Sequence, residues 1–149
     1  MAKVIGTDVK LINKATFKAN DRFVSSPDGR VMGGKMTVST KATATAITLT
    51  AAEVLGGMIL QDPTGGAVTT NLPTAALLSA ALGGAIAGDS LEFTIRNTAD
   101  ANETITVEAG TGGTMSGTKT IAQNNSKRFL IVFSSKSVST AYSLGTVTH

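Results

Sequence analysis

The chain has 149 residues, a net charge of +3 and a hydrophobic fraction of 42%. This length and composition predict one folded domain, with room for an arm, and argue against wholesale disorder. The absence of cysteine excludes a disulfide scaffold, a thiol nucleophile and a thiolate zinc site. Aromatic residues make up only 4% and tryptophan is absent, so the core must consist mainly of aliphatic side chains, which favours help from an oligomer partner.

Charge is unevenly distributed along the chain. Residues 1–41 carry eight basic and three acidic side chains, a balance of +5, whereas the remainder carries five basic and seven acidic ones, a balance of −2. A basic segment in front of a mildly acidic body predicts an arm that binds a negatively charged surface. The alternative is an ordinary solvated surface, because the charges are interspersed. Nucleic acid is disfavoured as a partner because no basic cluster is interleaved with aromatic residues.

Neither a secretory leader nor a membrane-spanning helix is indicated. The first ten residues mix charged and apolar side chains and contain no apolar signal-peptide core. The longest uncharged run, residues 63–88, is interrupted by prolines and glycines, which a spanning helix would not tolerate well. We therefore expect a soluble protein without a membrane partner.

The first 46 residues predict short extended pieces rather than a core of their own. Pro27-Asp28-Gly29 is typical of a tight turn. Phe17 and Phe23 are the only aromatic residues of this segment and could anchor it to a neighbour. We therefore divide the chain into an N-terminal arm, residues 1–46, and a folded β-rich domain, residues 47–149.

Between Met36 and Leu82, strand and helix signals alternate. Threonine at nearly every second position of residues 36–50 predicts a strand with a polar face. Thr50 and Glu53 have the spacing of a capping box, and Gly56-Gly57 follow, so a short helix is predicted over residues 51–55.

Two strands and a second helix are expected next. The strands lie on either side of a turn at residues 62–66. The helix begins near Pro73 and ends at Gly83-Gly84, since proline favours the first turn and glycine the end of a helix. Ala75, Leu78 and Leu82 share one of its faces, which we expect to cover the end of a sheet.

From Asp89 onward the chain predicts strands. Residues 90–97 and 103–109 alternate apolar and polar side chains around a turn-rich stretch, which predicts a hairpin. Residues 127–133 carry apolar side chains on both faces, typical of a central strand or of a strand covered by a partner. Residues 141–149 predict the last strand.

A glycine-rich stretch, GGTMSGTKT from Gly112 to Thr120, superficially resembles a phosphate-binding loop. Gly112 and Gly117 have the required separation, but Thr118 intrudes before Lys119. Phosphates bind at the amino end of a helix, and the residues that follow predict a turn and a strand instead. We therefore interpret the stretch as a connection between strands.

Other catalytic chemistry finds little support. The only histidine, His149, is the last residue, where a frayed terminus is the simplest expectation and a general base is not. Asp89, Glu92, Asp100 and Glu103 could supply the carboxylate pair of a glycoside hydrolase, but each lies beside a turn or on the polar face of a strand, where solvated carboxylates are normal. The residues 97–103 do not have the spacing of an EF-hand calcium loop. We expect no enzymatic activity, no cofactor and no metal.

Several phrases of the chain resemble small structural proteins of tailed-bacteriophage virions, in particular capsid decoration (cement) proteins. They are LTAAEVLGGMILQDPTGG, LPTAALLSAAL, LEFTIRNTADANETITVEAGTGGTMSGTKTIAQNNSKRFLIVF and YSLGTVTH, within residues 47–149. Similar blocks occur in phage proteins described only as structural, so the resemblance is more specific for the virion than for its part. Residues 1–46 do not carry it and could adapt the common domain to a particular capsid.

This resemblance implies a β-rich domain that assembles as a homotrimer over threefold positions on the capsid exterior and stabilises the shell. The partner would be the major capsid protein, and the protein would be made in the host cytoplasm. A tail-fibre or baseplate module is the alternative within virions. A carbohydrate-binding β-sandwich module is the alternative outside them, disfavoured because its sites usually need exposed aromatic platforms.

The expected fold is therefore mainly β: a small β-sandwich or barrel-like domain with one or two short helices, an extended N-terminal arm and a trimeric state. An oligomer interface is assigned to the two-faced strand through Phe129, Ile131 and Phe133. The capsid-docking residues are assigned to the arm. Its lysine and arginine side chains would steer the arm to the capsid surface, and its apolar side chains would hold it there. They are Lys3, Ile5, Lys10, Ile12, Lys14, Phe17, Lys18, Arg22 and Phe23.

Overall fold

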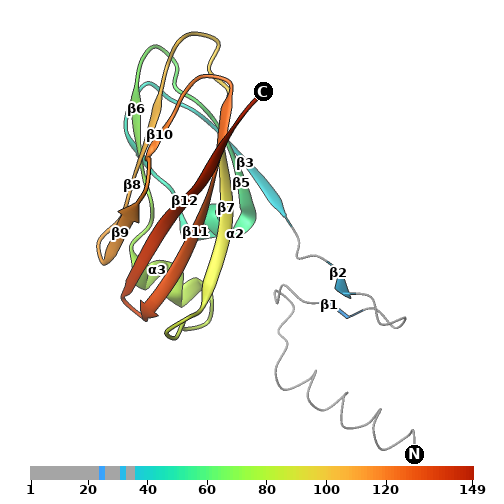
Figure 1. Cartoon of the computed structure of the whole chain (residues 1–149), viewed down its shortest axis with the longest axis vertical. Coiled ribbons are helices and arrows are strands. Elements are labelled where there is room, and N and C mark those ends of the chain that lie inside the picture. Colours follow the sequence, from blue (N-terminus) through green and yellow to red (C-terminus); the bar gives the residue numbers. More distant parts are fainter. Residues whose placement is uncertain (1–23, 26–30, 33–35) are drawn as a thin grey trace, which may run out of the picture. The chain divides into compact units, whose positions relative to one another are not determined.

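The structure is a computed structural model that describes residues 24–25, 31–32 and 36–149 (Figure 1). The chain divides into two compact units, Met1–Lys35 and Met36–His149. In the first unit, strands β1 (Val24–Ser25) and β2 (Val31–Met32) pair antiparallel. The remaining described residues, 36–149, form the second unit.

The second unit consists of two mixed β-sheets with two short helices, so the predicted mainly-β class is confirmed. The larger sheet has six strands and the smaller has four. In the order of the larger sheet, the strands are β3 (Thr37–Ala42), β5 (Gly57–Asp62), β7 (Ser90–Asn97), β11 (Asn125–Ser135), β12 (Val138–Thr148) and β9 (Gly113–Ser116). The smaller sheet runs β10 (Thr120–Ile121), β8 (Ile105–Glu108), β6 (Val68–Asn71) and β4 (Ile47–Thr48).

The boundary between arm and domain lies earlier than the predicted position after residue 46. Strand β3 pairs in parallel with β5 over its whole length and forms one edge of the larger sheet. Residues 36–46 are therefore part of the folded body, and the compact unit begins at Met36. The expected single strand over residues 36–50 is divided between β3 and β4, which lie in different sheets.

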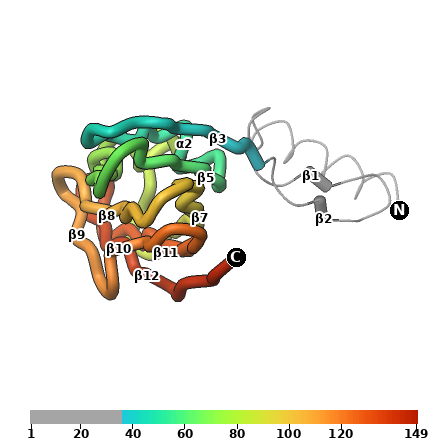
Figure 2. The backbone as a smooth tube through the Cα atoms, turned by 90° about the horizontal axis from the view of Figure 1, so that it is seen from above, coloured from blue at the N-terminus to red at the C-terminus, as the bar shows by residue number. Residues whose placement is uncertain are grey.

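The chain passes back and forth between the two sheets. It runs from β3 to β4, from β5 to β6 and from β7 to β8, and each strand lies parallel to its counterpart from the previous passage. In Figure 2, β7 and β11 lie on one side of this unit and β8 on the other. Strands β10, β11 and β12 then add antiparallel pairs.

This winding contradicts the predicted hairpin between residues 90–97 and 103–109, because β7 and β8 belong to different sheets. Hydrogen bonds of Asn97, at the end of β7, explain why the chain crosses to the other sheet there. Its buried side-chain amide donates to the carbonyl of Glu103 at 2.9 Å and to the carbonyl of Ile121 at 3.1 Å, and its oxygen accepts from Ala99 N–H at 3.0 Å. These bonds hold the crossing loop and β10 to the end of β7 in place of a hairpin ladder.

A common core fills the space between the sheets. Its larger side chains come from both, with Ile59, Phe93 and Phe129 from the six-stranded sheet and Ile105 and Ile121 from the four-stranded one, each at most 1% exposed. The rings of Phe93 and Phe129 stack with centroids 5.3 Å apart. Aromatic stacking and area burial both favour this arrangement, so a core with few aromatic residues places them together.

The two helices lie at crossings between the sheets. Helix α2 spans Ala51–Gly56, one residue beyond the prediction, and ends at Gly57, whose φ of 91° is in the left-handed region. Helix α3 spans Ala75–Ala81, and Thr74 rather than Pro73 caps its start. Ala75 and Leu78 are buried as expected. Leu82 is 37% exposed, because it already lies beyond the last helical residue.

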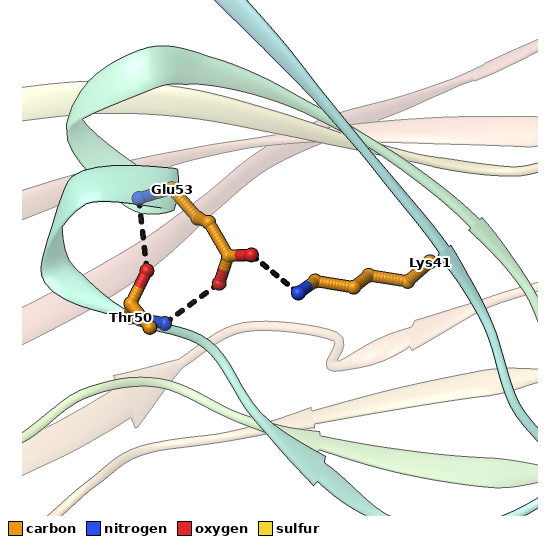
Figure 3. Close-up of polar contacts among 3 residues, drawn as sticks. All are labelled: Lys41, Thr50 and Glu53. Carbon is orange, nitrogen blue, oxygen red and sulfur yellow. Dashed lines mark hydrogen bonds and ion pairs between the residues drawn. The ribbon is translucent and has the colours of Figure 1, made fainter.

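The predicted capping box of α2 is confirmed and extends to an ion pair (Figure 3). Thr50 Oγ1 accepts from the N–H of Glu53 at 3.3 Å, and the Glu53 carboxylate accepts from the N–H of Thr50 at 2.8 Å. The same carboxylate pairs with Lys41 on β3. Burial alone would raise the pKa of Glu53, but the hydrogen bonds from Lys41 and Thr50 and the charge of Lys41 outweigh it and lower the pKa.

Glu53→Gln tests this contact between helix and edge strand. A group whose pKa is lowered by folding stabilises the folded state above its ordinary pKa of 4.5, and this contribution is lost as the pH falls through the folded pKa. We expect the variant to be less stable than the wild type by about 0.5–1 kcal/mol at pH 7, since glutamine keeps the cap but loses the ion pair. Chemical unfolding at several pH values measures the difference.

The difference should shrink as the pH falls from 7 through the lowered pKa of Glu53, where the wild-type carboxyl itself becomes protonated. Asp100→Asn, a similar substitution in an exposed loop, is the control and should change stability little at either pH. An equal loss for Glu53→Gln at pH 7 and at the most acidic pH where the wild type stays folded would show that the ion pair with Lys41 is not the source of the stability.

Candidate functional site

The glycine-rich stretch is part of the β-structure. It contains β9, and Lys119 is followed by β10 rather than by a helix, as the sequence predicted. A Cβ atom on Gly110 would lie 2.4 Å from the carbonyl oxygen of Leu72, and one on Gly112 would lie 2.2 Å from that of Ser137. These glycines are needed because backbone approaches backbone there, and no cradle for a phosphate is formed.

Lys119, the residue that would contact phosphate in a nucleotide site, already has a partner. Its Nζ atom donates to both carboxylate oxygens of Glu108, at 2.8 and 2.7 Å. Both side chains are about 40% exposed, so this is a surface ion pair on the four-stranded sheet. The contact connects β8 to the segment just before β10.

The four carboxylates considered for hydrolysis have separate surroundings. Asp89 accepts a backbone N–H in the turn before β7, and Glu92 faces an arginine on β11. Asp100 lies exposed in the loop after β7. Glu103 was expected to be solvated but is only 6% exposed. Its carboxylate accepts a hydrogen bond from the N–H of Gly65 at 2.6 Å and so connects the loop after β7 to the turn after β5. Within the described part of the chain, no three acidic or histidine side chains gather as a metal site.

The terminal histidine is held rather than frayed. Its ring Nε2 lies 2.9 Å from the hydroxyl of Ser126, and its backbone N–H donates to the carbonyl of Asn124 at 2.9 Å. These contacts extend the pairing of β12 with β11 to the last residue. The imidazole therefore helps to close a strand pair and contacts no carboxylate in the described structure.

A groove of about 610 Å³ opens at one end of the four-stranded sheet. It lies where three parallel strands end, and its lining includes Leu49 after β4, Leu72 after β6 and Gly110 after β8. Leu77, 59% exposed on α3, contributes to its wall. The lining is made of aliphatic, threonine, asparagine, proline and glycine residues and contains no charged side chain.

The inner side of β11 corrects one assignment made from the sequence. Phe129, Ile131 and Phe133 are at most 1% exposed and pack into the core between the two sheets. Because the chain itself buries these side chains, they cannot serve as the surface of an oligomer interface. The strand lies between β7 and β12, which confirms the prediction that residues 127–133 form a central strand.

The opposite side of β11 and its neighbours carries apolar residues where solvent-exposed positions are usually polar. We call this side of the six-stranded sheet the outer face. Leu130 lies directly opposite Tyr142 of β12, and Ser126 lies opposite Val147. Tyr142 and Leu144 are each 41% exposed and Val147 is 59% exposed. Exposed apolar side chains gathered on one face mark an interaction surface more often than scattered ones do.

The nine residues assigned to capsid docking, from Lys3 to Phe23, all lie outside the described residues. Within the described part of the chain, no helix is long and apolar enough to cross a membrane. Sequence reasoning did not single out the outer face of β12, although the alternation of Tyr142 and Leu144 at the end of the chain is a visible signal for it.

Gly112→Ala tests the backbone requirement of the glycine-rich stretch. Alanine there must accept both a φ of 78° and a clash with the carbonyl of Ser137, so we expect a loss of about 3 kcal/mol or more. Gly83→Ala is the matched control: its φ is 87° but its surroundings are open, so about 1 kcal/mol is expected. Equal losses in thermal or chemical unfolding would contradict the close-approach explanation.

Lys119→Ala tests the phosphate interpretation directly. Loss of a surface ion pair costs about 1 kcal/mol or less, so the variant should fold normally. Isothermal titration with ATP and magnesium should give no binding heat for either protein. If the wild type binds ATP and the variant does not, the stretch is a nucleotide-binding site after all.

Comparisons with protein-family models, with curated proteins and with solved structures found no match for this chain. Its function must therefore be argued from the surfaces and contacts described above.

Proposed function

We propose that this chain is a structural protein of a tailed-bacteriophage virion that binds the exterior of the capsid and stabilises the shell. The observation that carries the proposal is the outer face, where Tyr142, Leu144 and Val147 are exposed on the last strand of a well-packed body. Such a surface suits a protein that works by assembling with other subunits, copies of its own chain included. The resemblance of residues 47–149 to capsid decoration proteins supports the same conclusion.

The domain architecture, oligomeric state, partner and location are proposed from the same resemblance. We propose that the two mixed sheets around one core form a β-sandwich or barrel-like domain. We propose a homotrimer at threefold positions, with the major capsid protein as partner, located on the virion exterior after synthesis in the host cytoplasm. Three side chains that were considered for other chemistry each make a structural contact, which is compatible with a binding role: Lys119, Glu103 and His149.

Docking to the shell is assigned to the basic N-terminal segment. Lys41, the last basic residue counted with it, pairs with Glu53 inside the folded body. The docking assignment therefore narrows to residues 1–35, which carry seven basic and three acidic side chains. Lysine and arginine would steer the segment to an acidic shell surface, and its isoleucine and phenylalanine side chains would supply the burial that holds it.

A carbohydrate-binding module remains the alternative of a different class. Its sites usually stack sugars on exposed aromatic rings. Among the described residues, Phe93, Phe129 and Phe133 are at most 1% exposed, and Tyr142 is the one aromatic side chain at the surface. This distribution favours the virion proposal. A tail-fibre or baseplate location is distinguished from a capsid location by electron microscopy of labelled virions.

Removing residues 1–35 tests the docking assignment. The cut preserves β3 and the whole core, so the truncated protein should keep its circular dichroism and its cooperative unfolding. We expect it to lose binding to capsid shells stripped of the protein, measured by co-sedimentation. Binding of the full chain should slow in high salt without vanishing, because salt screens charge steering but leaves apolar burial intact.

Lys136→Gln, a neutralised lysine in the exposed turn of the body, is the control for charge and should bind shells as the wild type does. Undiminished shell binding by the truncated protein would place the docking surface in the body instead.

A further inference from the structure

The outer face of the six-stranded sheet continues on both sides of β7. On one side it includes Met58 and Leu60 of β5, which lie opposite Thr94 and Arg96 of β7. On the other side it includes the partly buried Leu130 of β11 and the exposed side chains of β12. Residues paired in register point to the same side of a sheet, so these apolar side chains belong to one surface.

Four charged side chains lie among these apolar ones, and their charges cancel. Arg96 and Glu92 project from β7, Asp62 follows Leu60 by two residues on β5, and Arg128 lies opposite Thr94 on β11. Arg128 and Glu92 form a loose pair, with 3.8 Å between Nε and the carboxylate. The acidic side chain of β5 and the basic side chain of β11 therefore stand on opposite sides of β7.

Two polar atoms of this surface lack partners. Arg96 Nε and Asp62 Oδ1 are shielded from solvent, and neither makes a hydrogen bond among the described residues. Atoms of this chain already cover both, so a partner could pair with them only after the side chains move.

We propose that a second copy of this chain covers the outer face, with the β5 side of one copy against the β11–β12 side of the next. The β5 side brings Met58, Leu60 and the acidic Asp62. The β11–β12 side brings Leu130, Tyr142 and the basic Arg128. A head-to-tail contact of this kind closes into a ring when the rotation between successive copies is a whole fraction of a turn, as it is in the proposed threefold assembly.

Charge is the reason for a second copy rather than the shell. A surface of one charge sign, such as the acidic one that the basic N-terminal segment would seek, would meet two like charges on this face, Asp62 and Glu92, beside the two arginines. A copy of the same chain presents two arginines and two carboxylates to a face that carries the same set, so each charge can lie against an opposite one. This inference rests on the proposed function only for the trimeric stoichiometry, since self-association is measurable without a capsid.

The test uses the full chain with Leu144→Asp and Val147→Asp combined, two exposed positions where aspartate should leave folding intact. The control combines Leu77→Asp and Ile86→Asp, which are 59% and 65% exposed on and after α3. Light scattering between about 1 and 100 μM follows the mass against the 15.1 kDa of one chain. We expect an oligomer for wild type and control, and at least about tenfold weaker assembly for the outer-face variant.

Arg128→Glu examines the charges, with Lys136→Glu as a control that makes the same charge change in the turn beyond the sheet. Arg128 is 61% exposed, so the folded monomer should tolerate the change, and assembly should weaken only for this variant. A monomeric wild type would overturn the inference and the proposed trimer together. An oligomer that resists the outer-face variants, or that dissociates in the α3 control, would overturn the inference alone. Shell binding, measured separately, tests the proposed function.

Discussion

The architecture depends on one constraint: the chain changes sheet at nearly every crossing, so neither sheet can be completed without the other. Strands β3, β5 and β7 become neighbours only if the intervening β4 and β6 occupy the smaller sheet. The shared core holds the two layers together through side chains from both, Phe93 and Phe129 among them. Non-local pairing of this kind makes folding of the body depend on contacts between residues that lie far apart in the sequence.

Local signals in the sequence were reliable wherever the physics was local. The capping box at Thr50 and Glu53 and the glycine that ends α2 act within a few residues, and both are present in the structure. Pairing between strands was not predictable in this way. The alternation in residues 90–97 is equally compatible with a hairpin, and only the distant contact of Asn97 with Ile121 shows why β8 joins the other sheet.

The glycine-rich stretch shows the same limit at the level of a motif. Glycine is required wherever backbone must come close to something, and a phosphate and a neighbouring carbonyl impose the same requirement. At Gly112 the close neighbour is the carbonyl of Ser137, near the turn between β11 and β12. The sequence could exclude the phosphate because no helix followed Lys119, but it contained no local sign of which backbone would take its place.

The two sides of β11 separate stability from recognition. Its apolar residues on both faces allowed a central strand or a covered one, and the sequence could not say which side met the core. Burial of Phe129 and Phe133 assigns the inner side to folding, so a partner that contacts this part of the sheet can reach only its outer side, where Leu130 and the exposed side chains of β12 lie. Substitutions on the outer side can therefore alter assembly without entering the core. Recognition is then free to change while the fold that presents it stays the same.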